Sequence, residues 1–448
     1  MALEETSLSI KQKSTQPTID RLAQKLVELV EMFRKGGPAS DYQWWGQETP
    51  RTVYTAYSGY QGGYKIFDEV VKGVIKLNSD MLSRHEVEWK LTYIFLKEQA
   101  SYPDKLSGQE LVNKAKDQII ELVEFKDWQD IDVPIMNLLL EGEPAKLGYV
   151  TFVAATKEDI ENWEEKNYAA RVQGIADVHV FARVHAPGDL EKACSYARTQ
   201  INIALDVLRI LCFPFGPDIN RRRIGVDSCR IGVIGEIPFS GATPVRVNQK
   251  QFATTFTGTG LYERPEVRKL ISKELGESQW ELINKLVLKA EHSRSDMENK
   301  LLDGIHWLGE STKPDTNRAR FLKIGVALET LLGGEPKKDE DLKVRGIKAM
   351  LAERAAFIAE NGLDDRLDIH TKVRGHYKTR SEIVHGDKRD VPLTDIDDFG
   401  ILVRSLALAS LEKLYKLGDN LRTVNDLESW VKNQRYSSRR KSLLNRNK

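Results

Sequence analysis

Residues 377–386 read Tyr-Lys-Thr-Arg-Ser-Glu-Ile-Val-His-Gly, and they set the expected fold of the C-terminal third of the chain. The pattern is typical of the last turns of a helix. On a helix that turns about 100° per residue, Arg380 and His385 lie about 140° apart and about 7.5 Å along the axis. These two side chains therefore occupy different faces. Gly386 predicts the left-handed cap that ends the helix.

Two polar lines run along this expected helix. His376 and Arg380 stand four residues apart, and so do the successive members of the set Tyr377, Ser381 and His385. A guanidinium is always charged, whereas an imidazole titrates near neutrality. Together they suit phosphodiester cleavage, because one group stabilises added negative charge and the other moves a proton.

Residues 380–386 contain an arginine, four further residues, a histidine and a glycine on one expected helix. This stretch resembles the motif of the HEPN ribonucleases, and in particular that of their Apea-like group. A second matching stretch, residues 321–332, reads Phe-Leu-Lys-Ile-Gly-Val-Ala-Leu-Glu-Thr-Leu-Leu and is similar to that group's helix with an acidic residue before paired leucines. Tyr377 and Glu329 strengthen the match. The resemblance covers the C-terminal third of the chain.

The chemistry is expected to need no metal ion. RNA carries its own nucleophile, the 2′-hydroxyl beside the scissile phosphate, so cleavage requires proton transfer and charge stabilisation. His385 is the expected proton-transfer group, and Arg380 the stabiliser of the crowded phosphorus centre. One histidine cannot both accept the 2′ proton and donate to the leaving 5′ oxygen at the same time.

The resemblance implies where the second proton-transfer group comes from. HEPN nucleases build one composite site from two such helices in a dimer. It implies a helical bundle and a homodimer or higher homo-oligomer. It also implies endoribonuclease products with a 2′,3′-cyclic phosphate and a 5′-hydroxyl. Ser381, one turn before His385, would orient the histidine or touch phosphate, and Tyr377 would do the same or stack a base. Glu329 would hold Arg380 or His385 in position.

RNA contacts are expected to be local, because 67 Lys and Arg against 66 Asp and Glu give no overall basic field. Lys378 lies within the motif. The tail 433–448 contains Arg439, Arg440 and Lys441 and no acidic residue. These side chains predict phosphate contacts that weaken with salt. A solvated, disordered end is the alternative for this tail.

A structural role for the motif is the main alternative. Arg380 would pair with an acid such as Glu382 or Glu329 to hold the bundle together, and His385 would satisfy a helix end. The protein would then be a non-catalytic dimerisation or adaptor module, or an RNA-binding protein. Replacing His385 separates this alternative from the nuclease.

The order of elements predicts an α+β protein, with a sensor-like mixed α/β region ahead of an all-α bundle. We expect four parts: residues 1–130, mainly helical; 131–262, α+β with a mixed sheet; 263–435, the bundle; and 436–448, the basic tail. Strands are expected at 131–135, 147–153 and 178–184. Helices are expected at 193–211, 265–275, 278–291, 294–309, 317–332, 342–360, 366–386, 394–417 and 424–434. Thr394 and Asp397 predict a capping pair for the helix 394–417.

Composition predicts a cytoplasmic protein with no membrane segment, because no apolar run approaches the length of about 20 residues that a membrane helix needs. Three cysteines, Cys194, Cys212 and Cys229, suit a reducing compartment. No cofactor and no metal site is expected. The resemblance implies antiviral defence by growth-arresting RNA cleavage. We expect the N-terminal region to sense or regulate, with a phage-derived or small-molecule trigger.

Overall fold

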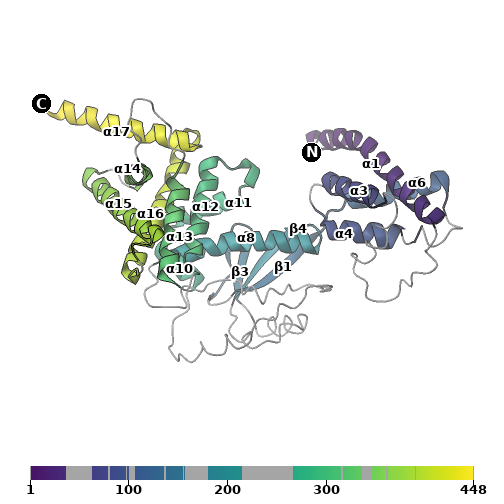
Figure 1. Cartoon of the computed structure of the whole chain (residues 1–448), viewed down its shortest axis with the longest axis horizontal. Coiled ribbons are helices and arrows are strands. Elements are labelled where there is room, and N and C mark those ends of the chain that lie inside the picture. The colour runs from purple at the N-terminus through teal and green to yellow at the C-terminus, as the bar shows by residue number, and fades with distance from the viewer. Residues whose placement is uncertain are drawn as a thin grey trace. The chain divides into compact units, whose positions relative to one another are not determined.

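The computed structural model describes most of the chain in segments. These segments are residues 2–36, 63–78, 81–96, 98–99, 106–135, 138–154, 156, 180–213, 266–313, 316–334, 346–359, 362–388 and 390–446. These segments are mostly helical and contain one small four-stranded antiparallel sheet, which confirms the α+β class (Figure 1). No helix in the segments just given is long and apolar enough to cross a membrane.

The chain divides into two compact units. The first contains the described residues of 1–131 and 185–197, and the second those of 132–184, 198–213 and 266–446. The division into four parts remains a prediction.

The first unit is built on helices. They are α1 (Ala2–Gly36), α3 (Gly63–Leu77), α4 (Arg84–Trp89), the π-helix η1 (Lys90–Leu96) and α6 (Gly108–Val123). Helix α1 packs against α3 and α6. Apolar residues at helical spacing, such as Leu22, Leu26 and Leu29 of α1, are fully or almost fully buried in its core. The hydrophobic effect on these apolar faces holds the helices together.

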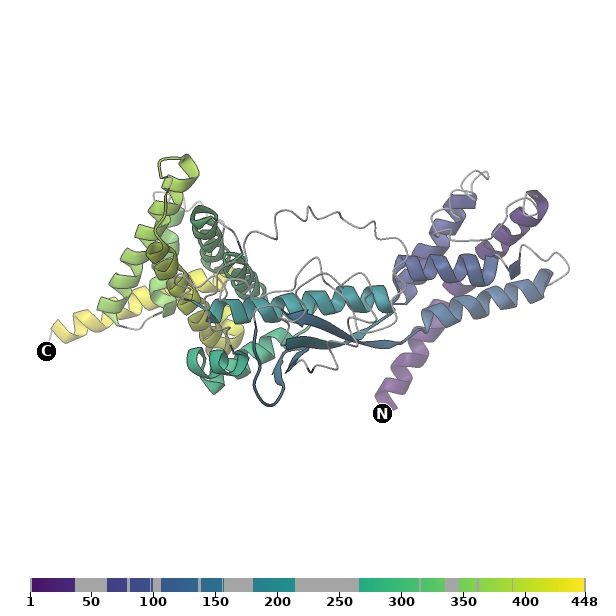
Figure 2. The same cartoon turned by 90° about the horizontal axis from the view of Figure 1, so that it is seen from below.

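The sheet has the strand order β1-β4-β3-β2. The strands are β1 (Trp128–Ile135), β2 (Ala145–Leu147), β3 (Val150–Ala154) and β4 (Val180–Pro187). The expected strand 147–153 is wrong as a single element, because Gly148 takes a φ of 59° and turns the chain between β2 and β3. Figures 1 and 2 show α8 (Leu190–Leu211) running along one face of the strands.

The described part of the second unit from residue 266 onward is built of helices. Its longer elements are α10 (Val267–Glu274), α11 (Glu277–Leu288), α12 (Asp296–Glu310), α13 (Asn317–Leu332), α14 (Ile347–Ala359), α15 (Leu363–His385), α16 (Leu393–Leu417) and α17 (Val424–Arg446). Helix α16 packs against α11, α12, α13 and α14, and ten of its residues are buried. The expected helices of this region are present with ends shifted by a few residues, except that α17 continues to Arg446.

The caps explain several of these helix ends. Ser295 and Glu298 form a reciprocal capping box that starts α12. The predicted cap of α16 is wrong: Pro392 occupies the cap position, which places Thr394 inside the first turn. Gly386 ends α15 with a φ of 87°, which confirms the predicted left-handed cap.

Helix α15 is much less covered than α16. Of its 23 residues only Val373 and Ile383 are buried, while Leu363 and Leu367 are 65% and 56% exposed. It packs mainly on α14 and also on α13. Most of its surface is therefore available to solvent within a single chain.

Candidate functional site

The site is built where α15 packs against α13. Arg380 of α15 points to α13, where its Nη2 lies 3.2 Å from both carboxylate oxygens of Glu329. Both side chains are about three-quarters buried, with 25% and 29% of their surface exposed. Partial burial strengthens such a pair relative to one fully in water.

Gly325 creates the space that Arg380 occupies. It lies one helical turn before Glu329 on the same side of α13, so the two residues meet α15 together. A β-carbon at position 325 would lie 2.9 Å from Cγ of Arg380. The glycine in the stretch 321–332 is therefore a fitted contact for the arginine stem, a role that the sequence pattern did not indicate.

Tyr377 completes this group. The guanidinium carbon of Arg380 lies 5.6 Å from the centre of the Tyr377 ring, within the range of a cation–π interaction. Burial, followed by hydrogen bonding to Glu329, raises the pKa of Tyr377 to about 12. Tyr377, Arg380 and Glu329 thus form one polar cluster, which we call the arginine cluster.

His376 faces the core of the bundle. Its ring stacks on Phe399 of α16 at a centroid distance of 4.7 Å and an interplanar angle of 11°, and it also contacts Phe321. Burial lowers the pKa of His376. This histidine packs in the bundle, and its burial disfavours the charged imidazolium.

His385 lies at the exposed end of α15, on a different side of the helix from Arg380, as the helical geometry predicts. Within the described residues it makes no hydrogen bond or ion pair. Gly386 follows it directly and ends the helix. The structure therefore does not bring the imidazole and the arginine cluster together within one chain.

Arg318 of α13 is a residue that sequence reasoning missed. Its Nη2 donates a 2.7 Å hydrogen bond to the carbonyl of Ile383, an otherwise weakly satisfied oxygen in the last turn of α15. A cation is favourable at a helix C-terminus because of the helix dipole. The exposed Arg318 therefore holds the turn that carries His385 and adds positive charge next to it.

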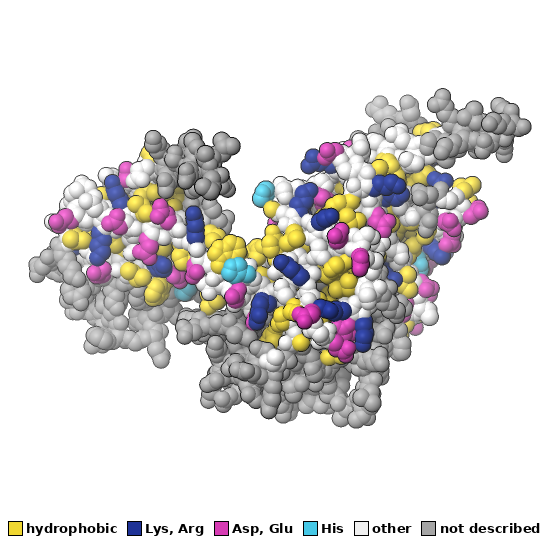
Figure 3. All heavy atoms as spheres, turned by 180° about the vertical axis from the view of Figure 1, so that it is seen from behind, with side chains coloured by type: hydrophobic (Ala, Val, Ile, Leu, Met, Phe, Trp, Pro, Cys, Tyr) yellow, Lys and Arg dark blue, Asp and Glu magenta, His cyan; other side chains and the backbone are white. Residues whose placement is uncertain are grey.

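The other expected site residues are dispersed. Lys378 is 69% exposed and lies 3.6 Å from Glu382, a loose surface pair, and Ser381 is half-buried. Arg439, Arg440 and Lys441 fall within α17, but their side chains lie outside the described part of the structure. On the face shown in Figure 3, the described basic and acidic side chains are interspersed, without a large area of one charge.

The arrangement can bind an anion and move a proton at the same end of α15. In the part of the chain that the structure describes, no group of three metal-ligating side chains includes a residue of the arginine cluster or His385.

Comparison with known proteins gives no relative: no family model, no curated protein and no solved structure matches this chain.

Proposed function

We propose that this protein is a metal-independent endoribonuclease of the HEPN type, with Arg380 and His385 as its catalytic residues. The observation that carries the proposal is the arginine cluster, which holds Arg380 in a fitted space on the same helix as a solvent-exposed histidine. A held guanidinium needs little reorganisation when charge develops, which is the main source of electrostatic catalysis.

The proposed reaction balances without a further reactant. The 2′ oxygen of RNA forms a bond to phosphorus, its proton passes to one His385 imidazole, and the bond from phosphorus to the 5′ oxygen breaks. A second imidazole, in its protonated form, donates to the leaving oxygen. The products carry a 2′,3′-cyclic phosphate and a 5′-hydroxyl.

A homodimer supplies the second imidazole in this proposal. The large exposed surface of α15 supports it, because two copies of the helix could approach each other along that surface. His385 and Arg380 of the two chains would then surround a single phosphate. Arg380 retains the donors of Nη1 for this purpose, since within the described residues its hydrogen bond to Glu329 comes from Nη2.

We further propose that the N-terminal region regulates the bundle and that the protein acts in the cytoplasm in antiviral defence. RNA cleavage that arrests growth must be suppressed until it is needed. The trigger would be phage-derived or a small molecule. Lys378 and the basic segment with Arg439, Arg440 and Lys441 would contribute phosphate contacts.

The second candidate is a non-catalytic adaptor or RNA-binding module. The ion pair between Arg380 and Glu329 favours it, since this pairing between α13 and α15 is what a structural role requires. In that case His385 has no chemical part, and its removal changes neither RNA nor growth.

One experiment separates the two candidates. RNA ends are sequenced after expression of the wild type, of His385→Ala, and of His370→Ala as a matched control that removes a histidine from the same helix. The nuclease predicts loss of new 5′-hydroxyl ends and of toxicity in His385→Ala alone, with the cleavage insensitive to EDTA. Equal RNA ends in all three proteins would support the adaptor.

A further inference from the structure

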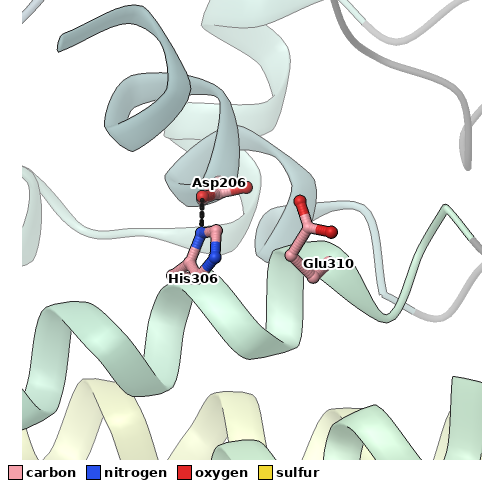
Figure 4. Close-up of side chains that lie close together, drawn as sticks. All are labelled: Asp206, His306 and Glu310. Atoms are coloured by element: carbon pink, nitrogen blue, oxygen red, sulfur yellow. Dashed lines mark hydrogen bonds and ion pairs between the residues drawn. The ribbon is translucent and has the colours of Figure 1, made fainter. Parts of the chain in front are cut away.

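Three side chains with metal-ligating atoms converge between α8 and α12, away from the proposed nuclease residues. They are Asp206 of α8 and His306 and Glu310 of α12, and their ligand atoms all lie within 4.8 Å of one another. Figure 4 shows the two carboxylates and the imidazole gathered around one space. One hundred residues separate Asp206 from His306, so only the fold brings the set together.

Gly309 allows this close approach. A β-carbon at position 309 would lie 2.6 Å from Oδ1 of Asp206, so any larger residue would push the carboxylate away from α12. His306, Gly309 and Glu310 stand at positions i, i+3 and i+4 and therefore share one face of the helix. The glycine places the Asp206 carboxylate beside that face.

Asp206 is held in a fixed orientation. It is buried, with 4% of its side chain exposed, and Oδ1 accepts a hydrogen bond from Nη1 of Arg209 at 2.5 Å. Its other oxygen, Oδ2, lies 2.8 Å from Nδ1 of His306. Ligating carboxylates are commonly hydrogen-bonded in this way by a second residue, which orients them toward the ion.

The 2.8 Å distance between Oδ2 of Asp206 and Nδ1 of His306 is short enough for a metal ion to replace the proton that the two atoms share. Tetrahedral zinc with bonds of about 2.0–2.1 Å holds neighbouring N and O ligands about 3.3 Å apart. Oδ2 and Nδ1 would separate by about half an ångström to reach that distance. Glu310 would close the third side by a change of side-chain rotamer.

Two lysines compete for Glu310. Lys313 and Lys323 both pair with its carboxylate, and their side chains are 43% and 30% exposed. Glu310 itself is 19% exposed, so it stays in place while the flexible lysine side chains can move into water. A divalent ion that also binds Asp206 and His306 gains two further ligands and can displace the lysines.

We propose that Asp206, His306 and Glu310 form a site for a divalent transition-metal ion of the zinc class, completed by water, which links α8 to α12. Imidazole and carboxylate ligands select such ions over Mg²⁺ and Ca²⁺, which prefer oxygen ligands alone. The proposal is independent of ribonuclease activity. It adds a site that the sequence, with its widely separated ligands, did not predict.

The test uses Co²⁺ as a spectroscopic probe on the full chain. Visible absorption is followed during titration of the wild type, of His306→Gln, and of His292→Gln as a control at another exposed histidine. We expect one Co²⁺ per chain, displaced by Zn²⁺, with affinity at least ten-fold weaker in His306→Gln and unchanged in His292→Gln. Absence of Co²⁺ binding to the wild type would overturn the proposal. Equal binding by the wild type and His306→Gln would also overturn it, as would happen if a cysteine held the cobalt.

Two further variants keep the test decisive if His306→Gln is unstable. Glu310→Gln should weaken Co²⁺ binding while leaving the buried pair of Asp206 and Arg209 intact. Lys323→Met should tighten it, because a competing cation is removed. Unchanged or weaker binding in Lys323→Met would exclude Glu310 as a ligand and overturn the three-residue site.

Discussion

Gly325 on α13 meets Arg380 on α15 so closely that a β-carbon at position 325 would lie 2.9 Å from Cγ of the arginine. The contact partner is the stem of a flexible side chain, so it can move away from a small substituent. Movement of the stem would carry the guanidinium away from Glu329. A small substituent at position 325 therefore tests the proposed role of Arg380 without removing the arginine.

We expect Gly325→Ala to lower RNA cleavage by about ten- to a hundred-fold while leaving the free energy of unfolding nearly unchanged. Alanine gains about 1 kcal/mol of helix propensity over glycine, and this gain offsets the cost of displacing Arg380. Cleavage rates and urea unfolding measure the two effects separately. The control is Gly375→Ala on α15, where a β-carbon meets nothing within 4 Å. It should stabilise the protein by up to about 1 kcal/mol without changing cleavage.

Most helices of the second unit could be predicted because their signals are local. Apolar residues recur at helical spacing between helix-terminating residues such as Gly333 and Gly386. Each helix end therefore follows from a few adjacent residues. The cap at Thr394 failed for a related reason. Pro392 fixes its own backbone in an extended conformation that already starts the helix, so the threonine falls two residues too late to cap it.

Most contacts that build the sites could not be predicted, because they join segments that are distant in sequence. For Arg380 the sequence offered both Glu329 and Glu382 as partners, and the packing of α13 on α15 selects Glu329. Arg318, Gly325 and Asp206 gave no local signal. The turn at Gly148 was missed because a two-residue connection divides a continuous apolar run.

The arginine cluster should make stability depend on alkaline pH. Burial and hydrogen bonding to Glu329 raise the pKa of Tyr377 to about 12 from its usual 10.0. The folded state thus favours the neutral phenol, and the stabilisation is fully present below pH 10 and lost as pH rises toward about 12. Urea unfolding of the wild type and Tyr377→Phe should show a smaller loss in the variant over this range. An identical loss in both proteins would contradict the placement of Tyr377.

His376 should make the stability of the fold depend on acidic pH. Burial against Phe399 lowers its pKa below the usual 6.5, so the folded state favours the neutral imidazole. The stabilisation is present above about pH 6.5 and is lost as pH falls through the lowered pKa, because the unfolded chain binds the proton more readily. His376→Phe keeps an aromatic ring at this position and should reduce the destabilisation measured by urea unfolding between about pH 7 and about pH 5. His292→Phe, at an exposed position, controls for the loss of one histidine.

Arg318 connects the stability of the last turn of α15 to the proposed chemistry of His385. Arg318→Ala removes the 2.7 Å hydrogen bond to the Ile383 carbonyl, which should cost about 1 kcal/mol in unfolding free energy. If the guanidinium also faces the RNA, the variant should raise KM and reduce the dependence of binding on salt by about one phosphate contact. Arg318→Lys retains the charge but loses the forked geometry of the guanidinium. Relative to Arg318→Ala, it should therefore restore the salt dependence of RNA binding more fully than the stability that comes from capping the helix. A change in stability alone, with KM and salt dependence as in the wild type, would limit Arg318 to capping the helix.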